Sequence, residues 1–201
     1  MRPRANFPIL LGFSLLSLSF FASCERGENE ATPEEVSEYR DLGEKASDAL
    51  MKSLGGQLKS ALQAGGPVEA LRICQQAAIP LTEAAGGQWD GVRITRKTLQ
   101  PRNPANAPDE SDRAVLVRMA DQAKAGGNPP APVLEWKEGK AIFYRPLMIQ
   151  EVCLNCHGAE EQLSPELNQV LAEKYPNDQA TGYSLGDFRG VIRVEMDQTP
   201  R

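Results

Sequence analysis

The sequence predicts an α+β fold in which a small antiparallel sheet packs against several helices. Three observations support this fold class: apolar residues recur at helical spacing in the first half, short β-branched or alternating segments occur in the second half, and the 15 prolines and 17 glycines cluster in identifiable loops. A chain of 201 residues is long enough for one ordinary globular domain with a small appendage, and too short for a multidomain enzyme.

Residues 1–23 have the composition of an export signal. Arg2 and Arg4 precede an apolar stretch over residues 7–21 that is too short to span a bilayer comfortably. Two small residues then stand directly before Cys24, as in the lipobox of bacterial lipoproteins. We therefore expect Cys24 to become the lipidated first residue of the mature chain, with ordinary cleavage nearby as the alternative.

Residues 24–35 are hydrophilic and acidic, which predicts a flexible tether between the lipid and a domain over residues 36–197. Export places this domain outside the cytoplasm, on the periplasmic or cell-surface side, where unprotected thiols tend to be oxidised. A formal net charge of -5 argues against a nucleic-acid partner, because phosphate binding needs a basic face. The membrane is instead expected as a partner through the lipid anchor.

Two helices are predicted before the first strand. Apolar spacing from residue 33 to about residue 64 indicates one long amphipathic helix, loosened at Gly55-Gly56. Gly65-Gly66-Pro67 ends it, and a second helix follows over residues 68–85, with a kink expected at Pro80.

The middle of the chain alternates strand, loop and helix. β-Branched residues at 91–99 indicate a strand, whereas three prolines and two asparagines in residues 100–109 predict a loop without regular structure. Asp109 is expected to cap a helix that runs to about Ala125, with Val115, Leu116 and Met119 facing inward.

The last third contains the remaining strands. Residues 133–136 and 140–148, joined around Glu138-Gly139, predict a β-hairpin. A short helix is expected over residues 164–175, and alternating apolar residues predict a final strand over residues 190–196.

The segment Cys153-Leu154-Asn155-Cys156-His157 is a C-x-x-C-H sequence, which is typical of covalent attachment of c-type haem. Thiols at this spacing can form thioethers with the two vinyl groups of one porphyrin, and the adjacent imidazole can then bind the iron. The single histidine of the chain stands at the required position, and no second C-x-x-C pair could complete a zinc site. A structural disulfide between Cys153 and Cys156 is the alternative.

Cys74 is the remaining cysteine, and it lies mid-helix on a face dominated by alanine that a flat macrocycle could approach. It is either an inert buried residue or the second axial ligand of the iron, opposite His157. The residues alone also leave open an unoccupied sixth position or a methionine ligand, for which the candidates are Met51, Met119, Met148 and Met196.

Haem propionates are anionic and usually contact arginine, asparagine, tyrosine or backbone donors. The candidates are Arg102, Asn103 and Asn106, with Arg96 and Arg145 as second choices. The alternative is that these side chains only brace the proline-rich loop. Aromatic residues that could border the ring are Trp136, Phe143, Tyr144 and Phe188, although strand aromatics more often belong to the core.

Four segments resemble the PAS-like c-type haem domain family of bacteria and cyanobacteria: residues 73–80 (ICQQAAIP), 98–110 (TLQPRNPANAPDE), 153–158 (CLNCHG) and 186–194 (GDFRGVIRV). The resemblance extends over about residues 32–196. It implies a PAS-like α+β fold that binds one haem c, with a histidine and a cysteine as axial ligands. On this sequence those ligands are His157 and Cys74. Members are often extracellular sensor portions of signalling proteins, but this sequence contains no output module.

A thiolate ligand stabilises Fe(III), so ligation by His157 and Cys74 predicts a low reduction potential. We therefore expect an exported, lipid-anchored monohaem c-type cytochrome that acts as a redox or small-ligand sensor for an unidentified redox or signalling partner. The alternatives are a low-potential electron-transfer protein and a haem-free interaction lipoprotein with a Cys153–Cys156 disulfide. No enzymatic activity is expected, because no second histidine is available as an acid–base catalyst.

Overall fold

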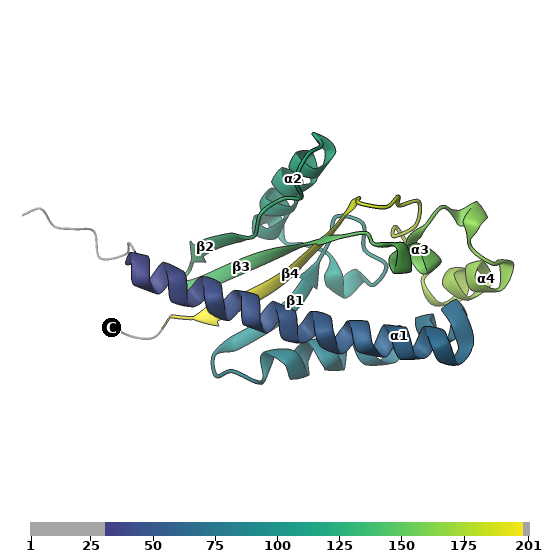
Figure 1. Cartoon of the computed structure of the whole chain (residues 1–201), viewed down its shortest axis with the longest axis horizontal. Coiled ribbons are helices and arrows are strands. Elements are labelled where there is room, and N and C mark those ends of the chain that lie inside the picture. The colour runs from purple at the N-terminus through teal and green to yellow at the C-terminus, as the bar shows by residue number, and fades with distance from the viewer. Residues whose placement is uncertain (1–30, 199–201) are drawn as a thin grey trace, which may run out of the picture. The chain divides into compact units, whose positions relative to one another are not determined.

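The structure is a computed structural model that describes residues 31–198, and it confirms the predicted α+β class (Figure 1). The export signal, Cys24 and most of the predicted tether lie outside the described residues. The elements, in chain order, are α1 (Pro33–Gly86), β1 (Val92–Lys97), the 3-10 helix η1 (Pro104–Asn106), α2 (Glu110–Lys124), β2 (Val133–Lys137), β3 (Lys140–Met148), α3 (Glu151–His157), the 3-10 helix η2 (Glu160–Gln162), α4 (Pro165–Lys174) and β4 (Phe188–Asp197).

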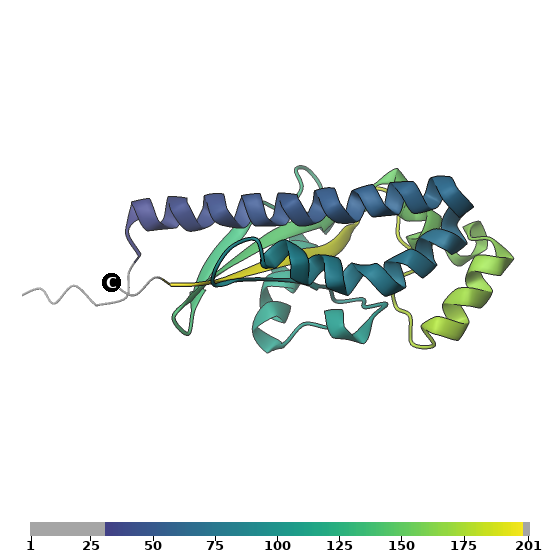
Figure 2. The ribbon, with the colours of Figure 1, turned by 90° about the horizontal axis from the view of Figure 1, so that it is seen from below.

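Helix α1 consists of two arms that fold back on each other, as Figure 2 shows. It begins inside the predicted tether, where Thr32 and Glu35 form a reciprocal capping box. Gly65 and Gly66 have non-helical dihedral angles, and the positive φ of 69° at Gly66 favours glycine. The predicted helix end is therefore confirmed as a joint between a first arm (33–64) and a second arm (67–86).

The predicted loosening at Gly55-Gly56 is wrong, because the backbone stays helical there. No other part of the protein lies within 4 Å of a Cβ placed at either glycine, so the site is open. Each glycine costs the helix about 1 kcal/mol relative to alanine, and a long helix packed on a sheet tolerates this cost. Helical dihedral angles also continue through Pro80.

The sheet has the order β1-β4-β3-β2, and every neighbouring pair is antiparallel. The predicted hairpin is confirmed: Glu138 and Gly139 have φ values of 49° and 73°, as a two-residue type I′ turn requires. The predicted first and last strands are also confirmed, each with slightly different ends.

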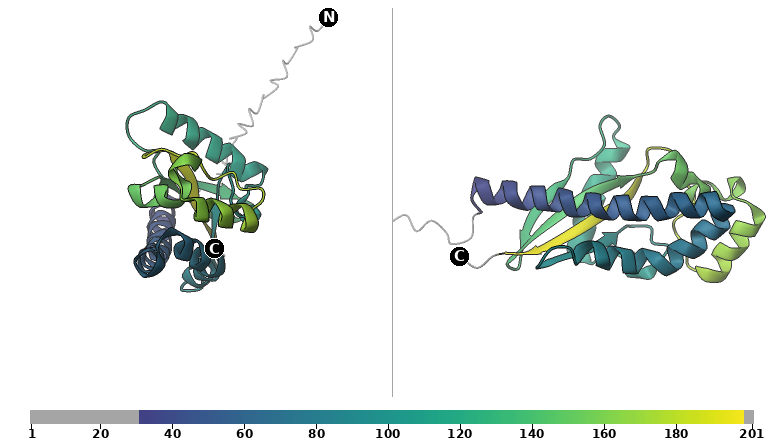
Figure 3. Two further views of the ribbon diagram at one scale, coloured as in Figure 1. Left: turned by 90° about the vertical axis from the view of Figure 1, so that its right-hand side faces the viewer. Right: turned by 60° about the horizontal axis from the view of Figure 1, so that its bottom comes forward.

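Helices cover both faces of the sheet, with α1 on one face and α2 on the other (Figures 1 and 3). Side chains alternate between the faces of a strand, so Phe143 packs toward α1 while its neighbours Ile142 and Tyr144 pack toward α2. The hydroxyl of Tyr144 donates to the buried carboxylate of Asp112 on α2 over 3.0 Å. This arrangement explains why successive strand residues are apolar.

Helices α3 and α4 lie together at one end of the domain, next to the joint of α1 (Figures 1 and 2). Leu71 on the second arm packs against Leu163, Leu167 and Leu171, and Cys156 lies at the edge of this cluster. The loop over residues 100–109 contains η1, so the prediction that it lacks regular structure is wrong. Within residues 31–198, no helix combines the length and the apolar character needed to cross a bilayer.

Candidate functional site

A cavity of about 220 Å³ lies between the two arms of α1, the loop that contains η1, and α3. It brings together the predicted haem-attachment cysteines, both predicted axial ligands and all but one of the predicted propionate contacts, Arg145 being the exception. Its lining consists of Leu58, Leu62, Ala70, Leu71, Cys74, Gln75, Ile79, Arg96, Arg102, Asn103, Asn106, Val152, Cys153, Cys156, His157, Tyr175 and Arg189.

Helix α3 carries the C-x-x-C-H motif onto the cavity wall. Residues at i, i+3 and i+4 share one face of a helix, so Cys153, Cys156 and His157 all line the cavity. Cys156 Sγ lies 4.0 Å from the carbonyl oxygen of Pro67, which places α3 against the start of the second arm of α1. Cys74, Cys153 and Cys156 are all free thiols.

The imidazole of His157 is fixed in one tautomer. Its Nδ1 lies 2.6 Å from the carbonyl oxygen of Ala180, and a carbonyl can only accept, so Nδ1 carries the proton. Burial, together with the positive charges of Arg102 and Arg189, lowers the pKa of His157 to about 3. The ring is therefore neutral at physiological pH, and its Nε2 has a lone pair for a metal ion.

Cys74 reaches the same cavity from the second arm of α1, one helical turn beyond Ala70. Burial raises the pKa of the Cys74 thiol, against the opposing effect of the positive charges on Arg96 and Arg102. The thiol is therefore protonated in the protein alone, although a bound metal ion displaces such a proton.

None of the four candidate methionines lines the cavity. Met196 belongs to the core on the α1 side of the sheet and Met119 to the core on the α2 side, and both are fully buried. Met51 is exposed on the first arm of α1, and Met148 is the last residue of β3. Of the sulfur atoms considered as a second axial ligand, that of Cys74 is therefore the one in the same cavity as His157.

The cavity lining contains three arginines and no acidic residue, although the chain has a net charge of -5. Arg189 donates to Thr98 Oγ1 over 2.7 Å and to the carbonyl oxygen of Gln100 over 3.1 Å, and its guanidinium lies over the Tyr183 ring. An anionic ligand would therefore be favoured by the charge of the lining.

Arg102 braces the site, as the alternative interpretation of the loop predicts. Its Nε donates to Asp178 over 2.8 Å, and one terminal nitrogen donates to the carbonyl oxygens of Cys156 and Ala180. Asn103 likewise uses its side-chain oxygen to cap η1, accepting from the backbone N–H of Ala105. Both residues line the cavity, but these contacts are internal.

Arg145 lies outside the cavity and pairs with Asp48 and Ser47 on the first arm of α1. Its strand position points it toward α1, because Phe143 and Arg145 are two residues apart and share a face of β3. Its assignment as a second-choice propionate ligand is therefore wrong.

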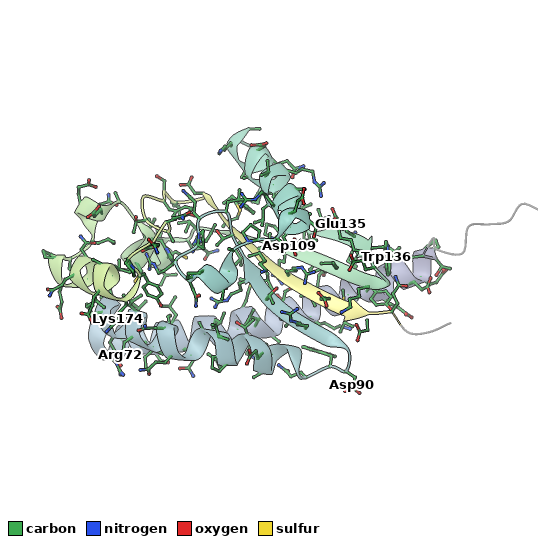
Figure 4. All side chains as sticks on the ribbon, turned by 180° about the vertical axis from the view of Figure 1, so that it is seen from behind. Arg72, Asp90, Asp109, Glu135, Trp136 and Lys174 are labelled. Carbon is green, nitrogen blue, oxygen red and sulfur yellow. The ribbon has the colours of Figure 1, made fainter. Side chains whose placement is uncertain are left out.

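None of the four aromatic residues considered as neighbours of a ring lines the cavity, and the alternative given for them, a place in the core, describes their packing. Phe143, Tyr144 and Phe188 belong to the two cores of the sheet. Trp136 packs edge-to-face on Tyr39 at the opposite end of the domain from Lys174, as Figure 4 shows. The register of the sheet decides this, because it turns these side chains toward α1 or α2.

Several lining residues were missed by the sequence analysis. Leu58 and Leu62 of the first arm lie one helical turn apart just before the joint, and this spacing could have marked them. Arg189 and Tyr175 give no comparable local signal, because only the folding of the chain brings them to α3.

The fold and the site together define a small α+β binding domain, in which a C-x-x-C-H helix faces a third cysteine across a cationic cavity. The chain belongs to the Tll0287-like family, whose profile matches residues 26–196. This match confirms the family resemblance found in the sequence.

A solved structure with a similar fold was found by comparison. It is the crystal structure of the cyanobacterial heme-protein Tll0287, which has a TM-score of 0.59 and 22% sequence identity to this chain. The match covers 85% of this chain and 99% of the other. No curated protein sequence matches this chain.

Proposed function

We propose that this chain binds one haem c, with Cys153 and Cys156 forming the thioethers and His157 and Cys74 as the axial ligands. The observation that carries the proposal is the convergence of these four side chains, from helices distant in sequence, on one cavity. Family membership supports it, because a structure with this fold is that of a haem protein.

The residues of the cavity fit such a group in their chemistry. The thiols of Cys153 and Cys156 share one face of α3, and the Nε2 atom of His157 is free to bind iron. A bound metal ion can displace the proton of the Cys74 thiol. Aliphatic side chains from both arms, among them Leu58 and Leu71, suit an apolar macrocycle, and the arginines suit its carboxylates.

The size of the cavity adds one requirement. Its volume of about 220 Å³ lies below the roughly 300–1,000 Å³ of typical small-molecule sites. The two arms of α1 contribute opposite parts of the lining and meet at Gly65 and Gly66. We therefore expect haem binding to widen the cavity by movement at this joint.

A bound haem c supplies an iron that accepts and donates single electrons. The protein contributes the orientation of His157 through Ala180 and a thiolate from Cys74, which favours the oxidised iron. A low potential and a ligand on a hinged arm suit a redox or small-ligand sensor. We propose that this sensor is exported, anchored through lipidated Cys24, and lacks catalytic activity.

A low-potential electron-transfer protein is the second candidate, and the rim of the cavity favours it. Ile79 and Val152 both line the cavity and keep 39% and 43% of their surface exposed. Exposed apolar side chains at this rim would bring a partner protein close to the edge of the macrocycle.

Expression with a cytochrome c maturation system tests the proposal. The full chain should gain the mass of one haem and give c-type pyridine haemochrome bands, whereas a Cys153→Ala, Cys156→Ala double variant should gain neither. If the matured protein carries no macrocycle, and Cys153 and Cys156 form a disulfide instead, the hypothesis of a haem-free interaction protein is correct.

Axial ligation is tested separately. Cys74→Ala should keep the covalent haem but convert a low-spin ferric spectrum to a high-spin one, and an unchanged spectrum would exclude Cys74 as a ligand. The matched control is Ser47→Ala, a buried position on the first arm of the same helix that does not line the cavity. Release of Cys74 on reduction or on addition of a diatomic gas favours the sensor, and unchanged ligation favours the electron carrier.

A further inference from the structure

We infer that Arg96 and Asn106 form the binding site for one carboxylate of the bound ligand, a propionate if the ligand is haem. The inference rests on the proposed function, and it replaces Arg102 as the principal charged partner. Arg96 and Asn106 both line the cavity.

Arg96 has no partner within the described part of the chain. It makes no hydrogen bond and no salt bridge there, and its Nε atom is buried without an acceptor. Three buried side-chain polar atoms among the described residues are unpaired in this way, on Thr95, Arg96 and Asp112. Of these residues, only Arg96 lines the cavity that holds the thiols and the imidazole.

A guanidinium whose Nε is buried without an acceptor is costly, because that N–H loses water without gaining another partner. Burial accordingly lowers the pKa of Arg96. Buried polar atoms in native proteins are seldom left without a partner, whether protein, water or ligand, and a carboxylate matches the planar fork of a guanidinium.

The other arginines near the cavity are already engaged. Arg102 is paired with Asp178 and two carbonyl oxygens, and Arg189 donates to Thr98 and Gln100. Arg96 is therefore the cation of the lining whose hydrogen-bonding capacity is unused.

The side chain of Asn106, like that of Arg96, has hydrogen-bonding groups without a partner among the described residues. Its backbone N–H and C=O are engaged with Asn103 and Thr98, whereas its side chain makes no hydrogen bond to the described residues. Asn106 and Arg96 also line a neighbouring groove along β1, so the two side chains lie together at the boundary between the groove and the cavity. A carboxylate there would accept from the carboxamide and from the guanidinium.

Cys74 is the competing partner for Arg96, because its thiolate would also attract the guanidinium. The two possibilities differ in one respect. A carboxylate partner requires a free acid on the ligand, whereas a thiolate partner stabilises any metalloporphyrin equally.

The experiment measures binding of ferric protoporphyrin IX and of its dimethyl ester, which has no free carboxylates. It uses the full-length chain purified before haem attachment, with its thiols kept reduced. The wild type should bind the free acid at least tenfold more tightly than the ester, as expected for loss of a charge-assisted hydrogen bond. Arg96→Met should abolish most of this preference, mainly by weakening the binding of the free acid.

Two variants serve as controls. Arg93→Met removes the same charge from an exposed position on the same strand and should keep the preference. Arg96→Lys keeps the charge without the planar fork and should retain part of it.

The possible outcomes separate the two proposals. If Arg96→Met weakens the binding of the free acid and of the ester equally, or changes neither, Arg96 does not bind a carboxylate. The proposal that the chain binds haem is not affected by that result. If the wild type binds neither porphyrin, and the matured chain also carries no haem, both proposals fail.

Discussion

Arg102→Met is the substitution that best separates bracing from ligand binding, because bracing is measurable without any ligand. In the folded protein Arg102 and Asp178 form an ion pair of 2.8 Å in which the two side chains are only 10% and 11% exposed. Removing one member of a buried pair costs about 3–5 kcal/mol, because the remaining charge is uncompensated.

The structure places the expected cost near the lower end of that range. Asp178 still accepts the backbone N–H of Ala180 over 2.8 Å, so its carboxylate keeps one donor when Arg102 is gone. A loss of about 3 kcal/mol in the free energy of unfolding corresponds to roughly 6–12 °C in Tm for a domain of this size. Urea and thermal unfolding of the haem-free protein measure both quantities.

Arg96→Met is the matched comparison, because Arg96 lines the same cavity without a partner. Replacing a half-buried guanidinium that has an unpaired Nε by an apolar side chain should leave the haem-free protein unchanged or more stable. If Arg102→Met changes the unfolding free energy by less than about 0.5 kcal/mol, the range for ordinary surface substitutions, Arg102 does not brace the site. A double-mutant cycle with Asp178→Asn should show a coupling of the two side chains.

Gly43→Ala should destabilise the protein by about 1–3 kcal/mol in urea unfolding, because a Cβ there would lie within 3 Å of the buried Phe143 ring. Gly55→Ala on the same helix, with no neighbouring atoms within 4 Å, should instead stabilise by roughly 0.5–1 kcal/mol; equal effects of the two would contradict the packing of α1 on β3. Asp109→Ala should cost about 1 kcal/mol, because the Asp109 carboxylate caps α2 by accepting from the backbone N–H of Asp112. This hydrogen bond lowers the pKa of Asp109, so its contribution is present above the unfolded-state pKa of about 3.9 and is lost as pH falls through the lower folded value. The difference in unfolding free energy between the wild type and the Asp109→Ala variant should therefore be larger at pH 6 than at pH 3.

Local patterns were sufficient for the elements and for the central motif of the site. The Glu138-Gly139 turn, the Asp109 cap and the glycine joint each depend on the conformational preference of a few adjacent residues. The spacing of Cys153, Cys156 and His157 fixes their common face once the segment is helical.

The roles of the arginines required the folded chain. Arg102 and Asp178 are 76 residues apart, and nothing local in the sequence indicates that they pair. Arg96 was only a second choice in the sequence analysis, yet among the described arginines that line the cavity it is the one that folding leaves without a partner.

The positions of the strand aromatics could not be predicted from the sequence either. Both faces of the sheet are covered by helices, so the sequence cannot show whether Phe143 or Tyr144 faces a cavity or a core. Which helix covers which face is decided by packing between distant segments.

The first arm of α1 separates the cavity from the point where the described chain begins. Leu58 lies 25 residues beyond Pro33, which corresponds to roughly 38 Å along a straight helix. The hydroxyl of Tyr39 donates to the carbonyl oxygen of Asp197 over 3.3 Å, so the last strand ends beside the beginning of this arm. Attaching the domain to an electrode through residues adjoining either Pro33 or Asp197 would therefore hold the cavity away from the metal surface. If the cavity holds a haem, direct electron exchange with the electrode should be slow in that orientation. Exchange should be faster when the protein is attached through a cysteine introduced on α4.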